Sequence, residues 1–122
     1  MMSFHLTEIG YRSDENILES MAVSTQDRYD IDNFIETASN GILSDIWDAW
    51  YNGIYRCNDV LDHMNGVQIP NYNKYRGECL FMRSWWYFNL YRTFGVVPIA
   101  RTVVPPAAAK LIPRCTEEEM YS

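Results

Sequence analysis

Residues 73–94, NKYRGECLFMRSWWYFNLYRTF, decide how this chain folds. When they are placed on a helix, apolar residues fall on nearly every face of it. A helix at a protein surface needs a polar face, so this pattern predicts one helix over 73–94 that is buried on all sides. Such a helix must pack against more than one neighbour.

The preceding stretch supplies one neighbour. Its apolar residues recur at alternating steps of four and three, which places them on one stripe of a helix: Leu43, Trp47, Trp50, Ile54, Cys57, Leu61 and Met64. Ser39 or Asn40 can cap the start of this helix, and Asn65-Gly66 offers the left-handed residue that ends many helices. The sequence predicts a helix over about 41–65, joined by a turn at 66–71 to the second helix. The two helices must therefore pack antiparallel.

Aromatic residues gather on these two helices. The chain of 122 residues has 4 Trp, 9 Tyr and 5 Phe, or 15% of its length, and most of them lie between Trp47 and Phe94. Exposed aromatic faces can stack on sugar rings, but these residues follow the spacing of a helix core. We interpret the cluster as the core of a helical hairpin and not as a sugar-binding platform.

The flanking regions are irregular. Residues 10–40 are polar and acidic, which predicts a loop-rich region with at most a short helical turn. Four prolines predict an extended, non-helical segment over 95–115. Residues 116–122 open with Thr116 and Glu119 in the pattern of a capping box, which indicates the start of a truncated helix. We therefore expect an all-α fold, with the chain forming one section, 1–122, of a larger α domain.

Charge and composition exclude several classes of protein. The net charge is −6, and residues 1–66 carry 12 acids against 3 arginines, which argues against a nucleic-acid partner. No apolar run reaches the ~20 residues of a membrane span. The first ten residues also lack a signal peptide or a lipid-attachment motif, which favours the cytosol unless the true N-terminus is missing.

The chain shows no motif for metal or cofactor binding or for catalysis. Cys57, Cys79 and Cys115 form no CxxC pair, and neither histidine has ligand-spaced neighbours, so we expect buried free thiols and no metal or cofactor. The serines lack a nearby histidine, and no pair among the 16 acids stands out. We therefore do not expect an enzyme.

Two residues of the second helix are interpreted as architectural. Arg83 stands among bulky apolar residues, so we expect it to pair with Glu78 or an acid of the first helix, or to stack on an aromatic ring. Gly77 would let another backbone approach the helix closely.

A longer motif runs over residues 77–98, GECLFMRSWWYFNLYRTFGVVP. It closely resembles the signature GEA-x-F-x-RA-x-x-YF-x-L-x-x-x-FG-x-VP of the SusD/RagB-like family of outer-membrane nutrient-binding lipoproteins. Residues 47–61 are similar to the preceding helix of that family, through Trp47, Tyr51, Ile54, Asn58 and Leu61. Residues 111–119 resemble its proline-arginine segment and the start of the next helix.

The resemblance implies a TPR-like helical scaffold in a protein several times this length. Members are tethered by a lipid to the outer-membrane surface, where they cover a SusC-like, TonB-dependent transporter. They capture oligosaccharides, or peptides in some members, and perform no chemistry on them. This chain would be an N-terminal section without the signal peptide and the lipidated cysteine, so the resemblance replaces the cytosol with the cell surface.

Candidate ligand-binding residues follow from the resemblance of residues 12–15 to the acidic motif before the family's ligand-side loop. They are Asp14, Glu15 and Asn16, which suit helix caps and loop hydrogen bonds equally well. Starch-binding relatives present tryptophans in the next loop, whereas this loop has no aromatic before Tyr29, so starch is not the expected ligand. Two alternatives from other classes stay open: a helical-repeat adaptor that binds another protein, and a metal-free enzyme.

Overall fold

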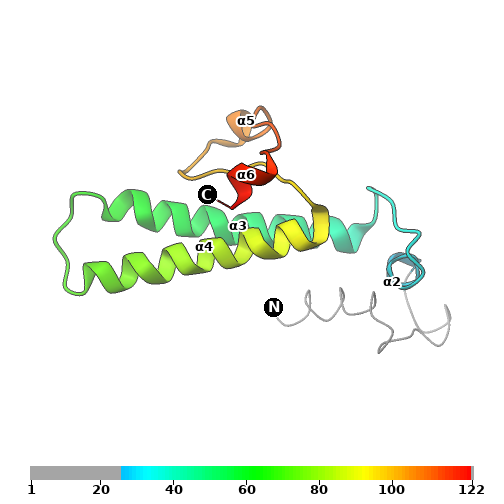
Figure 1. Cartoon of the computed structure of the whole chain (residues 1–122), viewed down its shortest axis with the longest axis horizontal. Helices are drawn as coiled ribbons and strands as arrows, with labels where there is room; N and C mark the ends of the chain where they lie inside the picture. Colours follow the sequence, from blue (N-terminus) through cyan, green and yellow to red (C-terminus); the bar gives the residue numbers. More distant parts are fainter. Residues whose placement is uncertain (1–25, 122) are drawn as a thin grey trace. The chain divides into compact units, whose positions relative to one another are not determined.

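The computed structural model describes residues 26–121. Their helices are α2 (Gln26–Asp32), α3 (Gly41–Met64), α4 (Tyr72–Phe94), α5 (Pro106–Ala109) and α6 (Glu117–Met120) (Figure 1). These residues contain no strand, which confirms the all-α fold class. The chain divides within α3, between Asp48 and Ala49, into two compact units that are described separately.

In the first unit, a buried amide sets the start of α3. The Oδ1 atom of Asn40 accepts a hydrogen bond from the Leu43 N–H (3.2 Å), and its Nδ2 donates to the Asp27 carbonyl (2.9 Å). Asp27 also accepts the Gly41 N–H on its carboxylate (3.2 Å). Asn40 is therefore the cap, while the Ser39 hydroxyl pairs with that of Thr37. The short helix α2 agrees with the helical turn expected within 10–40.

In the second unit, α3 and α4 form the predicted antiparallel hairpin, and they lie side by side in Figure 1. α3 ends one residue before the predicted boundary, and α4 starts one residue before it. The left-handed stop is at Gly66, with φ at 81°, and Asn71 before α4 is also left-handed, with φ at 59°. The turn residues therefore carry the conformations that end one helix and begin the next.

The hairpin interface is narrow and combines apolar with amide side chains. The buried residues of the second unit are Trp50, Ile54, Asn58 and Met64 on α3, Trp86, Asn89 and Leu90 on α4, and Val97 after α4. The Trp86 indole fills the space above Gly53, where a Cβ atom would lie 2.6 Å from Nε1. The prediction that Gly77 accommodates a close neighbour is wrong, because a Cβ atom there would meet nothing within 4 Å.

The aromatic residues divide between the interface and the surface. Trp50 and Phe94 meet edge to face with ring centroids 6.5 Å apart, and Tyr51 and Tyr87 do so at 6.4 Å. On α4, however, Phe81, Trp85 and Phe88 are 68%, 41% and 51% exposed. The expectation that α4 is buried on all sides is therefore wrong for this structure. One helical neighbour and an irregular segment leave part of its circumference open.

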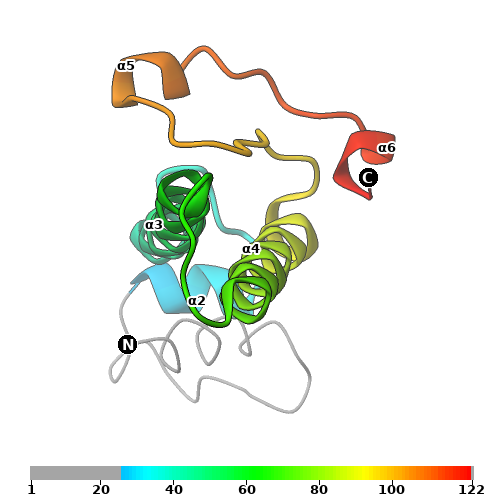
Figure 2. The ribbon, with the colours of Figure 1, turned by 90° about the vertical axis from the view of Figure 1, so that its left-hand side faces the viewer.

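Residues 95–121 lie over the hairpin as an extended segment that carries two helical turns (Figure 2). The expectation that proline excludes helix from 95–115 is wrong at α5, where Pro106 occupies the first turn. A proline is tolerated there because the N–H that it lacks would have no helical partner. The predicted capping box is confirmed: Thr116 and Glu119 exchange side-chain and backbone hydrogen bonds at the start of α6.

Candidate functional site

The three residues predicted to face a ligand, Asp14, Glu15 and Asn16, lie outside the described residues. Their roles stay predictions. Sites within residues 26–121 include a polar network between the hairpin and residues 98–103, a pocket beside α6 and a hollow at the hairpin turn.

The polar network centres on Asn58, which is only 1% exposed. Its Nδ2 donates to the carbonyls of Ala100 (2.8 Å) and Thr102 (3.1 Å). Its Oδ1 accepts from Nη1 of Arg83 (2.8 Å), which also donates to the Arg101 carbonyl (3.0 Å). One buried amide therefore connects both long helices to the extended segment.

Three further side chains of the hairpin bind the same segment. Tyr51 donates its hydroxyl to the Pro98 carbonyl (2.6 Å), and Asp62 accepts the Val103 N–H (2.9 Å). The Tyr87 hydroxyl accepts the Ala100 N–H (2.7 Å) and donates to the carbonyl of the same residue (3.0 Å). We call this set the backbone clamp: Tyr51, Asn58, Asp62, Arg83 and Tyr87. It satisfies backbone groups of residues 98–103 that a strand partner would satisfy in a sheet.

Burial keeps the two tyrosines of the clamp neutral. It raises the pKa of Tyr51 well above its ordinary value, with the neighbouring Tyr87 adding to the rise. Burial also raises the pKa of Tyr87, although its hydrogen bond to Ala100 acts in the opposite direction. A neutral phenol can both donate and accept, which the bonds to residue 100 require. Both phenols of the clamp therefore stay protonated beyond the pH at which an exposed tyrosine ionises.

Arg83 corrects a prediction from the sequence. Its partners are the Asn58 amide and the Arg101 carbonyl, and not Glu78, an acid of α3 or an aromatic face. Glu78 pairs instead with Lys74, at 3.9 Å on the surface. The sequence contained a signal for this arrangement, because Asn58 lies at core spacing after Ile54 and must have partners if it is buried.

A pocket of about 290 Å³ lies between α4 and α6. Its polar and aromatic lining includes Arg83, Tyr87, Tyr91, Glu119 and Tyr121. Tyr91 and Tyr121 meet edge to face with centroids 5.7 Å apart, and a side-chain hydrogen bond to Tyr121 raises the pKa of Tyr91. Rings beside hydroxyls and a guanidinium suit contacts with a polar ligand.

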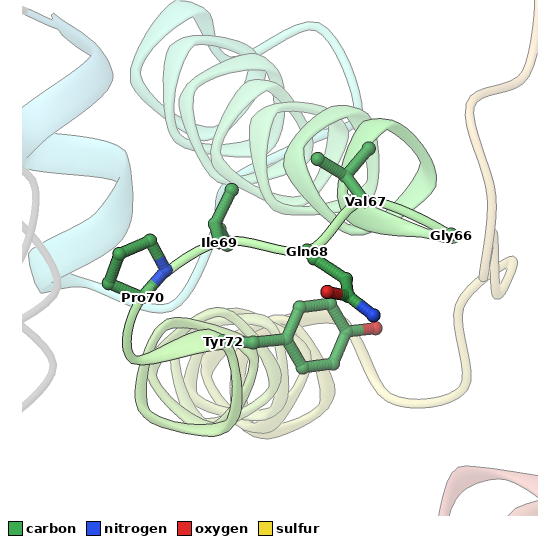
Figure 3. Close-up of a pocket in the computed structure, with 6 residues that line it drawn as sticks. All are labelled: Gly66, Val67, Gln68, Ile69, Pro70 and Tyr72. Carbon is green, nitrogen blue, oxygen red and sulfur yellow. The ribbon is translucent and has the colours of Figure 1, made fainter.

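A larger hollow of about 690 Å³ opens at the hairpin turn. It is lined by residues 66–70 and Tyr72, as Figure 3 shows. Val67 and Ile69 extend on the α3 side of the loop, and Gln68 extends on the side of Tyr72. This lining offers an amide and an aromatic ring, which are groups for weak binding of a neutral ligand.

The thiols are less buried than expected. Cys57, Cys79 and Cys115 are free, and all three are half-buried. Burial, and secondarily the neighbouring Cys79, raises the pKa of the Cys57 thiol, so it stays protonated and weakly nucleophilic at neutral pH. Within residues 26–121, no three His, Cys, Asp or Glu side chains gather as metal ligands. Nor is any helix in that range long and apolar enough to cross a bilayer.

Comparison with known proteins identifies the family. A protein-family model named SusD-like_3 and described as "Starch-binding associating with outer membrane" matches residues 5–122. The chain belongs to the SusD-like family. The resemblance seen in residues 77–98 is thereby confirmed. The family description concerns binding and the outer membrane, and the two hollows are compatible with a protein that binds.

A curated relative supports the same assignment. The SusD-like protein P38 of Formosa agariphila is 37% identical to this chain over 54 residues, which are 43% of this chain and 10% of the relative. The match thus spans about a tenth of the relative's length. No solved structure matches the chain significantly.

Proposed function

We propose that the protein containing this chain captures oligosaccharides at the surface of the bacterial outer membrane and passes them to a SusC-like, TonB-dependent transporter. The family match over residues 5–122 is the observation that carries this proposal. In it, a lipid anchor outside this chain supplies the attachment to the membrane, and the protein performs no chemistry on its ligand.

The described residues are suited to a structural role in a scaffold. The backbone clamp uses one buried amide, Asn58, and hydrogen-bonded side chains around it to hold backbone groups, which is a structural task. Its tyrosines have raised pKa values and its arginine is engaged, so the clamp offers no activated nucleophile or base. We place the ligand contacts at Asp14, Glu15 and Asn16, with further contacts outside this chain.

The proposal is tested by calorimetry on the full-length, lipid-free protein with three groups of soluble ligands. These are starch oligosaccharides, other plant and algal oligosaccharides, and short peptides. We expect binding to a non-starch glycan, because the loop after Asn16 has no aromatic before Tyr29. Binding to peptides only would make the protein a peptide-capturing member, and binding to neither would overturn the proposal.

The site assignment is tested with Asp14→Asn, Glu15→Gln and Asn16→Ala in the same protein. Each should weaken glycan binding by about tenfold, because hydrogen bonds to sugar hydroxyls are lost. Asp45→Asn is the matched control, since it removes an exposed carboxylate from α3. If all four variants bind like the wild type, the ligand site lies elsewhere.

The partner is tested by affinity purification of the tagged, lipidated protein from membranes solubilised in mild detergent. We expect a TonB-dependent transporter to co-purify in near-equal amount. Recovery of a soluble protein instead would favour the helical-repeat adaptor.

A further inference from the structure

Two of the three cysteines lie at the same level of the hairpin. Cys57 belongs to α3 and stands seven residues before that helix ends at Met64. Cys79 belongs to α4 and stands seven residues after that helix begins at Tyr72. Positions equally far from the turn of an antiparallel hairpin lie level with each other, because every residue adds the same rise along its helix. The two thiols are free and half-buried.

Both cysteines also lie on the interface side of their helices. Cys57 follows the buried Trp50 by seven residues, and Cys79 precedes the buried Trp86 by seven. Seven residues at 100° each bring a side chain back to within about 20° of its starting direction. Each cysteine therefore shares the helix face of a tryptophan in the core of the hairpin.

A hydrogen bond joins the two helices beside this pair. Asn58, the next residue after Cys57, accepts from Nη1 of Arg83 at 2.8 Å. Arg83 lies about one turn after Cys79. The Cys57 thiol responds electrically to both residues of α4: after burial, Cys79 is the next cause that raises its pKa, and Arg83 acts to lower it. The two thiols are thus neighbours across the interface.

We propose that Cys57 and Cys79 are a disulfide-forming pair that an oxidant can join across the hairpin. A disulfide bridges Cα atoms about 4.4–6.8 Å apart, and level, facing positions on two packed helices provide such a spacing. Cys115 lies outside the pair. Its N–H donates to the carbonyl of Val97, beyond the end of α4, at 3.2 Å.

The reaction is thiol–disulfide exchange with a small or protein disulfide as the oxidant. One cysteine, as its thiolate, attacks a sulfur of the oxidant, forms a mixed disulfide and releases the other sulfur as a thiolate. The second cysteine thiolate attacks the mixed disulfide, closes the protein disulfide and releases the remaining sulfur. The two thiol protons end on the released sulfurs, and the oxidant gains two electrons. The presence of such an oxidant rests on the proposed function, because an exported protein passes through an oxidising compartment.

The bond would close residues 57–79 into a loop that contains the hairpin turn. A cross-link restricts the opened chain more than the folded one, so the linked helix ends should open less often. We expect amides in residues 58–78 to exchange their hydrogens about tenfold more slowly in the linked protein than in the unlinked protein.

The test compares the full-length, lipid-free protein made in two compartments of a bacterial expression host. Exported to the periplasm, it folds in the presence of a disulfide oxidant, whereas in the cytosol it folds with reduced thiols. Free thiols are alkylated before digestion with trypsin, which puts the three cysteines in separate peptides: 57–74, 77–83 and one that begins at Cys115. We expect the exported protein to give 57–74 linked to 77–83, and the cytosolic protein to give both peptides alkylated.

The variants separate the pair from the third cysteine. Cys57→Ser and Cys79→Ser should each abolish the linked peptides in the exported protein. Cys115→Ser is the matched control and should retain them. Circular dichroism of each variant checks that the helices are retained, and mapping of the wild type tests the pair without any substitution.

Three results would overturn the proposal. One is an exported protein in which Cys57 and Cys79 are both alkylated. Another is a disulfide that joins either of them to a different cysteine, which would show that the two thiols do not face each other. The third is equal hydrogen exchange in the linked and unlinked proteins, which would overturn the stabilising role of the bond.

The proposed function is judged by a separate measurement. The same peptides are mapped for the protein isolated from its native cells. Linked peptides there would support both proposals. Free thiols in native cells, with linked peptides from the expression host, would support the pair and count against export to the cell surface.

Discussion

At the scale of single residues, two glycines of the hairpin should respond to alanine with opposite signs. In Gly53→Ala the new Cβ would lie 2.6 Å from Nε1 and 2.7 Å from Cε2 of the Trp86 ring. A buried ring can hardly move, so we expect a loss of about 1–3 kcal/mol in unfolding free energy despite the better helix propensity of alanine.

Gly77→Ala is the matched variant, because a Cβ atom there meets nothing within 4 Å. Its unfolding free energy should rise by about 0.5–1 kcal/mol, because alanine has a higher helix propensity than glycine. Urea unfolding of both variants, followed by circular dichroism, measures the two effects. Equal shifts would show that the Trp86 indole does not confine Gly53.

Tyr51 should make the free energy of unfolding depend on pH in the alkaline range. Burial is the largest of the causes that raise the pKa of this phenol above the ordinary 10.0. A raised folded-state pKa means that the unfolded chain loses the proton first, so the stabilisation is complete below about pH 10 and declines as the pH rises through the folded-state value.

We expect the unfolding free energy of the wild type to fall more steeply between about pH 10 and about pH 12 than that of Tyr51→Phe. Tyr55→Phe, an exposed tyrosine on the same helix, should keep the wild-type slope. Equal slopes for the wild type and Tyr51→Phe would contradict the role given to burial.

At the scale of elements, periodicity and end signals located the hairpin to within one residue at each boundary. They worked because the stripe from Leu43 to Met64 and the stop at Gly66 are local properties of the chain. The burial of α4 is not local, because it depends on what packs around the helix. Apolar residues on every face predict burial on every face, while Phe81 and Phe88 are exposed.

The start of α3 gives a test of a choice that the sequence left open. Asn40 caps the helix and also binds the Asp27 carbonyl, whereas the Ser39 hydroxyl bonds to Thr37. Asn40→Ala should cost about 1–2 kcal/mol of unfolding free energy, and Ser39→Ala less than about 0.5 kcal/mol. A larger loss at Ser39, measured by chemical unfolding, would reverse the assignment.

At the scale of the whole molecule, the sequence pointed to the family more clearly than to any site. A motif of 22 residues indicates the family, because it covers most of α4 and the residues that follow it. The backbone clamp could not be predicted in the same way, since its members are separated by up to 47 positions from the backbone that they bind. Only folding brings Asn58 next to Arg83 and to residues 100–102.

This separation makes the extended segment depend on Asn58. Asn58→Ala leaves two carbonyls and a guanidinium without their buried partner. This should lower the free energy of unfolding by about 2–4 kcal/mol. The loss should be greatest where the clamp acts. In hydrogen-exchange mass spectrometry, we expect faster exchange at the amides of Ala100 and Val103, with smaller changes in the interior of α3 and α4.

Asn52→Ala is the control for that variant, because this exposed residue of α3 bonds to Arg56 on the surface. It should change the unfolding free energy by less than about 0.5 kcal/mol and leave exchange over residues 97–103 unaltered. If Asn58→Ala speeds exchange uniformly over both helices, the amide supports the hairpin itself. If exchange becomes faster only over residues 97–103, the contacts between α3 and α4 stabilise the hairpin without the clamp. The clamp then serves to hold the extended segment against the hairpin.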